Sequence, residues 1–233
     1  MTLGTIGVGY LAVGAALAIA AAAARRGAAV RLLLGPSAQP PPVGVTTTSV
    51  ESVAQLGWAL SDATKDADAV VMTAAVADFR PASVAKDKLK RSEIGARTAI
   101  ELVANPDLLA GLGARRGRAR RPVLVGFAAE TSDVIEHARA KLEVKRCDLV
   151  VANDVSEPGA GFAVDTNHVT LVDREAAIDV PAGPKVEVAH RILDRVVALL
   201  AASAPGAADV RRSARGGRAP ARGKPRPKRP RRA

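Results

Sequence analysis

The sequence has 233 residues, enough for one domain with a sizeable core and a terminal appendage. Nearly half of the residues are apolar but only 2% are aromatic, so a core would consist of alanine, valine and leucine, and the single cysteine, Cys147, excludes an internal disulfide and a cysteine-only metal cluster. The net charge of +11 is concentrated at the C-terminus, because residues 206–233 hold eleven of the 34 lysines and arginines and one acidic residue, Asp209.

The first 24 residues carry no charge and are long enough to cross a bilayer. Alanine and glycine dominate them, however, and these residues contribute little transfer free energy. No basic segment typical of a secretory signal precedes them. We therefore predict a helix buried against a sheet, no membrane span and a cytoplasmic location.

Residues 7–12, GVGYLA, fit the dinucleotide-binding pattern G-x-G-x-x-A. Only six residues precede this segment, too few for a first strand, and the next apolar segment ends without the acidic residue that would hold a ribose. In a stretch so rich in glycine and alanine, we interpret the match as chance. An NAD(P)-dependent Rossmann oxidoreductase stays a distant alternative.

Four apolar runs are continuous rather than alternating, which is typical of parallel strands buried on both faces. They span residues 29–35, 68–76, 122–130 and 148–154. A hairpin-like pair follows at 168–173 and 176–180. The predicted fold class is α/β, with a Rossmann-like open, mostly parallel sheet flanked by helices and a small β-hairpin near the C-terminal end.

Helical patterns separate these runs, and each has a recognisable start. Thr48 and Glu51 have the spacing of a capping box. Asn105-Pro106-Asp107 offers a cap residue, a proline for the first helical position and an acid for the first turn. Residues 131–133 open a helix that runs to about residue 146, and residues 185–202 form a closing amphipathic helix.

Polar side chains follow several of the predicted strands. In open α/β sheets a ligand binds beyond the carboxyl ends of the strands. Asp78, the loop 128–131 and the pair Asn153-Asp154 all occupy such positions. We therefore expect them to line one crevice, where the small residues before Asp78 let a flat ligand approach the backbone.

Cationic side chains of two further segments could reach this crevice. Lys86, Lys88 and Lys90 lie in a polar loop that suits a flap closing over an anion, although on charge alone a solvated loop is the commoner explanation. Lys141 and Lys145 lie on one face of their helix. That spacing permits a phosphate clamp without requiring one.

Residues 204–233 form a basic tail that proline and glycine interrupt repeatedly. The tail has no apolar periodicity, so we predict that it is disordered. Attraction to a nucleic-acid backbone through this tail alone is one possible function. A solvated appendage without a dedicated partner is the interpretation that we prefer.

Six segments, in this order, stand out together: AAVADFRP, KDKLKR, ANPDLLAGLG, VGFAAET, ARAKLEVKRCDLVVANDV and GFAVDTNHVTLV. Their residues and spacing resemble the phosphopantothenate–cysteine ligase (phosphopantothenoylcysteine synthetase) domain of the bifunctional bacterial coenzyme A biosynthesis enzyme. The similarity covers residues 18–200. It predicts a nucleotide-binding ligase domain over residues 1–203.

The resemblance implies that 4′-phosphopantothenate attacks CTP to give an acyl-cytidylate, from which L-cysteine displaces CMP. It implies CTP as co-substrate, Mg²⁺ with unknown ligands, a homodimer, and a separate or fused phosphopantothenoylcysteine decarboxylase as partner. Carried over by position, Lys88 is the catalytic residue and closes on the phosphates and the carboxylate. The other implied contacts are nucleotide contacts at Ala74, Ala75 and Asp78, cytidine contacts at Pro106, Asp107, Leu108, Leu109 and Phe127, and contacts with anionic groups at Lys141 and Lys145.

The N-terminal segment departs from the family, which has a glycine-rich first strand and an Asn-x-Ser-Ser-Gly-Lys-Met-Gly turn. Register places that turn at residues 9–16, with Gly9 at the asparagine position and Gly14 at the lysine position. With no room upstream for a central strand, we expect the first strand and loop to be missing or altered, through a misassigned start or a truncation. A non-catalytic nucleotide-binding remnant is therefore the main alternative.

Overall fold

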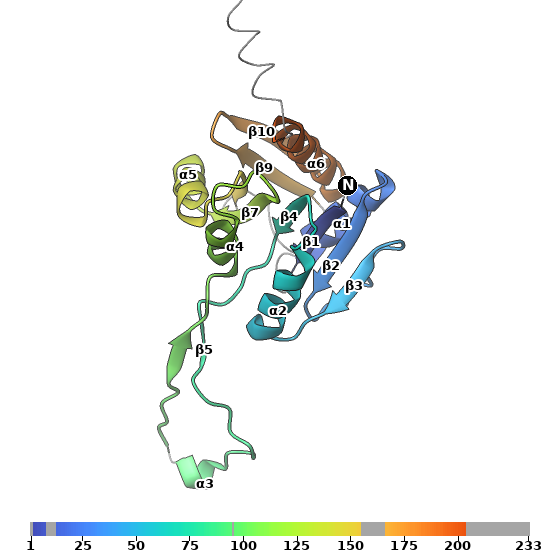
Figure 1. Cartoon of the computed structure of the whole chain (residues 1–233). Coiled ribbons are helices and arrows are strands. Elements are labelled where there is room, and N and C mark those ends of the chain that lie inside the picture. The colour runs from blue at the N-terminus through green and yellow to red at the C-terminus, as the bar shows by residue number, and fades with distance from the viewer. Residues whose placement is uncertain (1, 8–12, 95, 155–165, 204–233) are drawn as a thin grey trace, which may run out of the picture.

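The computed structural model describes residues 2–7, 13–94, 96–154 and 166–203. Its centre is one eight-stranded sheet, which Figure 1 shows with helices around it. Five strands are parallel from β8 to β2, β3 continues that direction at one edge, and β9 and β10 are antiparallel at the other. The predicted fold class is confirmed. In spatial order the strands are β10 (Ala177–Pro184), β9 (Thr166–Val172), β8 (Leu149–Asp154), β7 (Val123–Glu130), β4 (Ala69–Met72), β1 (Thr2–Gly7), β2 (Ala29–Leu34) and β3 (Thr46–Ser49).

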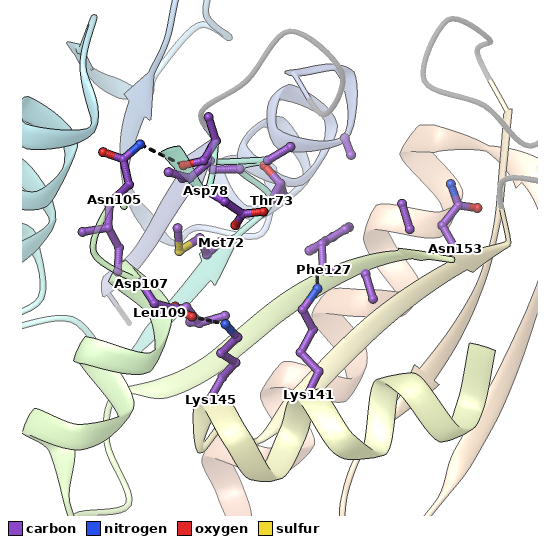
Figure 2. Close-up of a pocket in the computed structure, with 18 of the residues that line it drawn as sticks. Met72, Thr73, Asp78, Asn105, Asp107, Leu109, Phe127, Lys141, Lys145 and Asn153 are labelled. Carbon is purple, nitrogen blue, oxygen red and sulfur yellow. Dashed lines mark hydrogen bonds and ion pairs between the residues drawn. The ribbon is translucent and has the colours of Figure 1, made fainter. Parts of the chain in front are cut away.

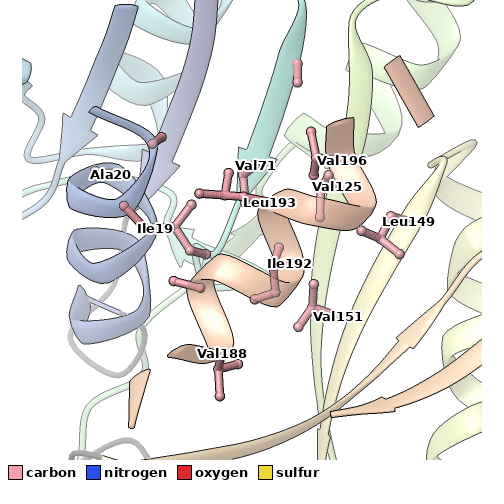
Figure 3. Packing of buried hydrophobic residues seen from close by; sticks show 14 of the residues in the cluster. Ile19, Ala20, Val71, Val125, Leu149, Val151, Val188, Ile192, Leu193 and Val196 are labelled. Carbon is pink, nitrogen blue, oxygen red and sulfur yellow. The ribbon is translucent and has the colours of Figure 1, made fainter. Parts of the chain in front are cut away.

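Helices cover both faces of this sheet. One face carries α1 (Val13–Arg25) and α6 (Lys185–Ala202), which pack on the sheet in the largest apolar cluster (Figure 3). The other carries α2 (Val53–Ala63), α4 (Leu108–Arg116) and α5 (Val134–Lys145). Within β4, Val70 and Val71 belong to opposite clusters, so both faces of the strand are buried and its apolar run is continuous. Among the described residues, no helix combines the length and apolarity needed to cross a bilayer.

The sheet does contain a first strand, contrary to our expectation. Strand β1 lies between β4 and β2, with Leu3 opposite both Ala69 and Val30. Six residues suffice because strands in globular proteins commonly have about five or six residues. The prediction that no central strand fits upstream is therefore wrong, whereas the loop at residues 8–12, with Gly9, lies outside the described residues. The same holds for the predicted tail at 204–233.

Two predicted helix starts are displaced. Thr48 belongs to β3, and the N-cap of α2 is Ser52, whose hydroxyl accepts a hydrogen bond from the Gln55 N–H at 3.2 Å. The Gln55 side chain accepts from the Glu51 N–H at 2.7 Å and completes a reciprocal cap. The N-cap of α4 is Asp107 rather than Asn105. Helices α5 and α6 begin and end where the sequence predicts.

An arm projects from the body of the molecule between β4 and α4 (Figure 1). It consists of a two-stranded antiparallel sheet, β5 (Phe79–Pro81) with β6 (Leu102–Ala104), and a short helix α3 (Arg91–Ile94). The predicted flap with Lys86, Lys88 and Lys90 lies in this arm and is exposed. We define residues 79–104 as the arm.

Cys147 is a core residue, as the sequence predicts. It is fully buried beneath α5, and this burial raises the pKa of its thiol to about 12 from 9.0. Because the folded pKa is the higher one, the buried site disfavours the thiolate. The full stability of the fold is therefore present below pH 9, and part of it is lost as the pH rises toward 12.

We therefore expect Cys147 to resist alkylation in the folded protein at pH 8, since the thiolate is the reactive form. The measurement is the rate of iodoacetamide labelling, followed by mass spectrometry, with and without denaturant. Rapid labelling without denaturant would contradict the buried placement.

Candidate functional site

A cavity of about 320 Å³ lies at the carboxyl edge of the strands (Figure 2). Ten of the eleven residues that the resemblance singled out line it. The exception is Lys88, which lies exposed in the arm and is not brought to the cavity. The ten lining residues are Ala74, Ala75, Asp78, Pro106, Asp107, Leu108, Leu109, Phe127, Lys141 and Lys145.

One wall of the cavity is the turn that carries Asp78. Asn105 holds this turn with two hydrogen bonds. Its backbone N–H donates to the Asp78 carbonyl at 2.7 Å, and its side-chain amide donates to the Ala77 carbonyl at 2.9 Å. Arg80 in turn donates to the Asn105 side-chain oxygen at 3.0 Å. Within the described residues no hydrogen bond or ion pair engages the Asp78 carboxylate. The turn therefore presents a positioned carboxylate to the cavity.

The opposite wall carries the two lysines of α5. Lys141 donates to the Phe127 carbonyl at 2.8 Å, while Lys145 forms an ion pair with Asp107. Asp107 also accepts from the Ala110 N–H at 2.9 Å and so caps α4. Both ammonium groups thus already have partners, and an anionic ligand would compete with Asp107 for Lys145. Because the Asp107 carboxylate already accepts from an N–H group at the start of α4, this helix start is a poor phosphate cradle.

The cavity extends over both faces of the sheet at this edge. Ala74 and Ala128 lie on the α4–α5 face, in contact with the cluster that contains Leu109. Strand alternation places the lining residues Thr73, Phe127 and Asn153 on the α1–α6 face. The cavity is therefore divided by the strand ends into an α4–α5 side and an α1–α6 side.

The crevice prediction is confirmed for Ala128, Ala129 and Asn153, whereas Glu130 and Thr131 do not line the cavity. Sequence reasoning missed Thr73, Asn167 and Lys185, which line the α1–α6 side. Asn167 is a polar residue at an inward position of a hairpin strand, which is the one signal that could have indicated it.

No group of three or more histidine, cysteine, aspartate or glutamate side chains gathers within the described ranges in a way that could hold a metal ion. A Mg²⁺ ion at this cavity would need most of its ligands from phosphates and water, as is usual for this ion. Asp78 is the lining carboxylate without a partner in the described part of the chain.

Known proteins resemble this chain over most of its length. It is 40% identical over 183 residues to the coenzyme A biosynthesis bifunctional protein CoaBC of Vibrio vulnificus (strain YJ016), covering 78% of this chain and 45% of that protein. It is 45% identical over 195 residues to CoaBC of Mycobacterium tuberculosis (strain H37Rv), covering 79% and 46%. The chain therefore spans just under half the length of these curated relatives.

Solved structures of related proteins are also similar to this chain. A crystal structure of the C-terminal domain of CoaBC matches with a TM-score of 0.70 at 32% identity, over 85% of this chain and 95% of that one. The DNA/pantothenate metabolism flavoprotein from Streptococcus pneumoniae, at 17% identity and a TM-score of 0.68 over 85% and 99%, shares the fold. The family model of the DNA/pantothenate metabolism flavoprotein C-terminal domain matches residues 13–200, so the chain belongs to that family.

Proposed function

We propose that this chain ligates 4′-phosphopantothenate and L-cysteine at the expense of CTP, as a step of coenzyme A biosynthesis. The observation that carries the proposal is the convergence of ten residues, from four separate segments, on one cavity at the carboxyl edge of the sheet. Membership of the family and the similarity to CoaBC over most of this chain support it.

The proposed reaction has two steps. A carboxylate oxygen of phosphopantothenate attacks the α-phosphorus of CTP, and the bond to the β-phosphate oxygen breaks, releasing pyrophosphate. The cysteine ammonium group loses one proton to water, and the resulting amine attacks the acyl carbon and then gives up a second proton to water. The acyl C–O bond breaks, and CMP leaves with the electron pair.

The residues suit this chemistry. Ala74 and Ala75 leave the backbone open to a planar base, and the Asp78 carboxylate can accept from an exocyclic amine or a ribose hydroxyl. Lys141 and Lys145 would stabilise the anionic phosphates, and Lys88 would supply charge where the pyrophosphate departs once the arm closes. We further propose Mg²⁺ held by the phosphates, a cytoplasmic location, a homodimer and a decarboxylase partner.

Pyrophosphate release tests the proposal. The purified chain should release pyrophosphate from CTP only when phosphopantothenate is present, and should form the amide only when cysteine is added. Replacement of CTP by ATP is the nucleotide control. A well-folded chain that releases no pyrophosphate above background would contradict ligase activity.

A non-catalytic remnant is the second candidate, and Gly14 is the observation that favours it. Gly14 stands in the first turn of α1 where the family has a lysine, and a side chain there would meet the Lys185 amine at 3.2 Å. This alternative predicts CTP binding by calorimetry without turnover. Binding of NAD(P)H in preference to CTP would instead favour the oxidoreductase interpretation.

A further inference from the structure

The α1–α6 side of the cavity holds three polar side chains that are not among the proposed nucleotide contacts. We define Asn153, Asn167 and Lys185 as the amide compartment. Asn153 on β8 and Asn167 on β9 line the cavity together with Lys185, the first residue of α6 (Figure 2 labels Asn153). Asn153 is opposite Val169 in the antiparallel register, so Asn167 is its diagonal neighbour on the same face, about 7–8 Å away. One small ligand can therefore reach both amides.

The two amides are buried with unsatisfied oxygens. Asn153 is 6% exposed and Asn167 is 8% exposed, and the Oδ1 atom of each has no hydrogen-bond partner within the described part of the chain. A buried acceptor without a donor is costly, and native structures rarely keep one without a reason. Two such oxygens on neighbouring strands indicate a site that awaits a ligand with hydrogen-bond donors.

Lys185 adds the opposite polarity to the same compartment. Its Nζ atom lies 3.2 Å from the position that a Cβ atom of residue 14 would take, over the first turn of α1. Glycine at position 14 leaves that space open to the amine. The compartment thus offers acceptor oxygens on two strands and an ammonium group beside them.

We propose that the amide compartment binds the zwitterion of L-cysteine, with the ammonium group on the two amide oxygens and the carboxylate on Lys185. The proposal rests on the proposed function. Of the three substrates, the amino acid alone carries a cationic donor, which makes the strongest hydrogen bonds with a pair of buried acceptor oxygens. The residues of α4 and α5 that are proposed to hold the nucleotide lie on the other face of the strand edge, and β7 lies between Asn153 and the Thr73 end of β4.

Cysteamine, which lacks the carboxylate of cysteine, tests the role of Lys185. We expect the wild type to prefer cysteine to cysteamine in kcat/KM by about tenfold or more, as for other charge-assisted contacts. Lys185→Gln should remove most of this preference. Lys65→Gln, at an exposed lysine paired with Asp62 outside the cavity, should retain it.

Asn153→Ala and Asn167→Ala test the amide oxygens. Each should raise the KM for cysteine by about tenfold, while the cysteine-independent release of pyrophosphate from CTP and phosphopantothenate keeps its wild-type rate. Circular dichroism and thermal melting verify that each variant folds. Unchanged KM in folded variants, or equal loss of both half-reactions, would overturn the proposal.

Failure of the proposed function remains distinguishable. If the wild type releases no pyrophosphate, the proposed ligase function is rejected. Calorimetric titration with cysteine and with cysteamine under reducing conditions then tests whether the amide compartment binds the amino acid. Tighter binding of cysteine in the wild type but not in Lys185→Gln supports the site. Equal affinity for the two amines, or no binding of either, overturns it.

Discussion

Lys88→Ala should slow pyrophosphate release by about 100- to 1,000-fold, which is the usual cost of removing one group that stabilises charge in a transition state. The residue lies exposed in the arm, between β5 and α3, and not in the cavity. Its contribution therefore arises only when the arm closes on the bound substrates. The measurement is the single-turnover rate of pyrophosphate formation from CTP and phosphopantothenate.

The Lys88→Ala substitution should leave the stability of the folded state unchanged. Exposed side chains outside special contacts usually change the free energy of unfolding by less than about 0.5 kcal/mol, so the melting temperature should stay constant. Lys86→Ala is the matched control, because Lys86 is exposed in the same segment. If both variants lose activity equally, and added salt reduces the wild-type rate in parallel, Lys88 attracts anions in general and is not the catalytic lysine.

The central strands could be predicted because burial on both faces leaves a signal in the sequence. The run around Val70 and Val71 is continuous since each residue faces a different helical layer. Strand β1 lacks that signal, because glycine and threonine are four of its six residues, and β3 is a polar edge strand with mostly exposed residues. Both strands are recognisable only from their pairing partners.

The site was predictable where it depends on strand ends. Asp78 and Asn153 reach one cavity because parallel strands share a carboxyl edge. Asn167 and Lys185 could not be placed in this way, since the position of Asn167 depends on the register of the antiparallel hairpin and that of Lys185 on how α6 packs against the sheet. The side of the sheet that each residue faces follows from pairing, which the sequence does not display.

Gly113→Ala should destabilise the fold by about 3 kcal/mol, at the upper end for an overpacked core position. Gly113 is buried in α4, where a Cβ atom would lie 2.2 Å from the Lys145 carbonyl oxygen and 2.9 Å from the Arg146 Cβ atom. These neighbours include backbone, so the last turn of α5 must move. Since Lys145 belongs to that turn, its ion pair with Asp107 should weaken as well.

Gly111→Ala separates this clash from the general effect of adding a methyl group to α4. Gly111 lies in the same helix, and a Cβ atom there meets nothing within 4 Å. Alanine should therefore stabilise the helix by about 0.5–1 kcal/mol. Urea denaturation of the two variants measures the difference. If both glycines tolerate alanine equally well, α4 does not approach α5 as closely as described, and the wall that holds Lys145 is placed incorrectly.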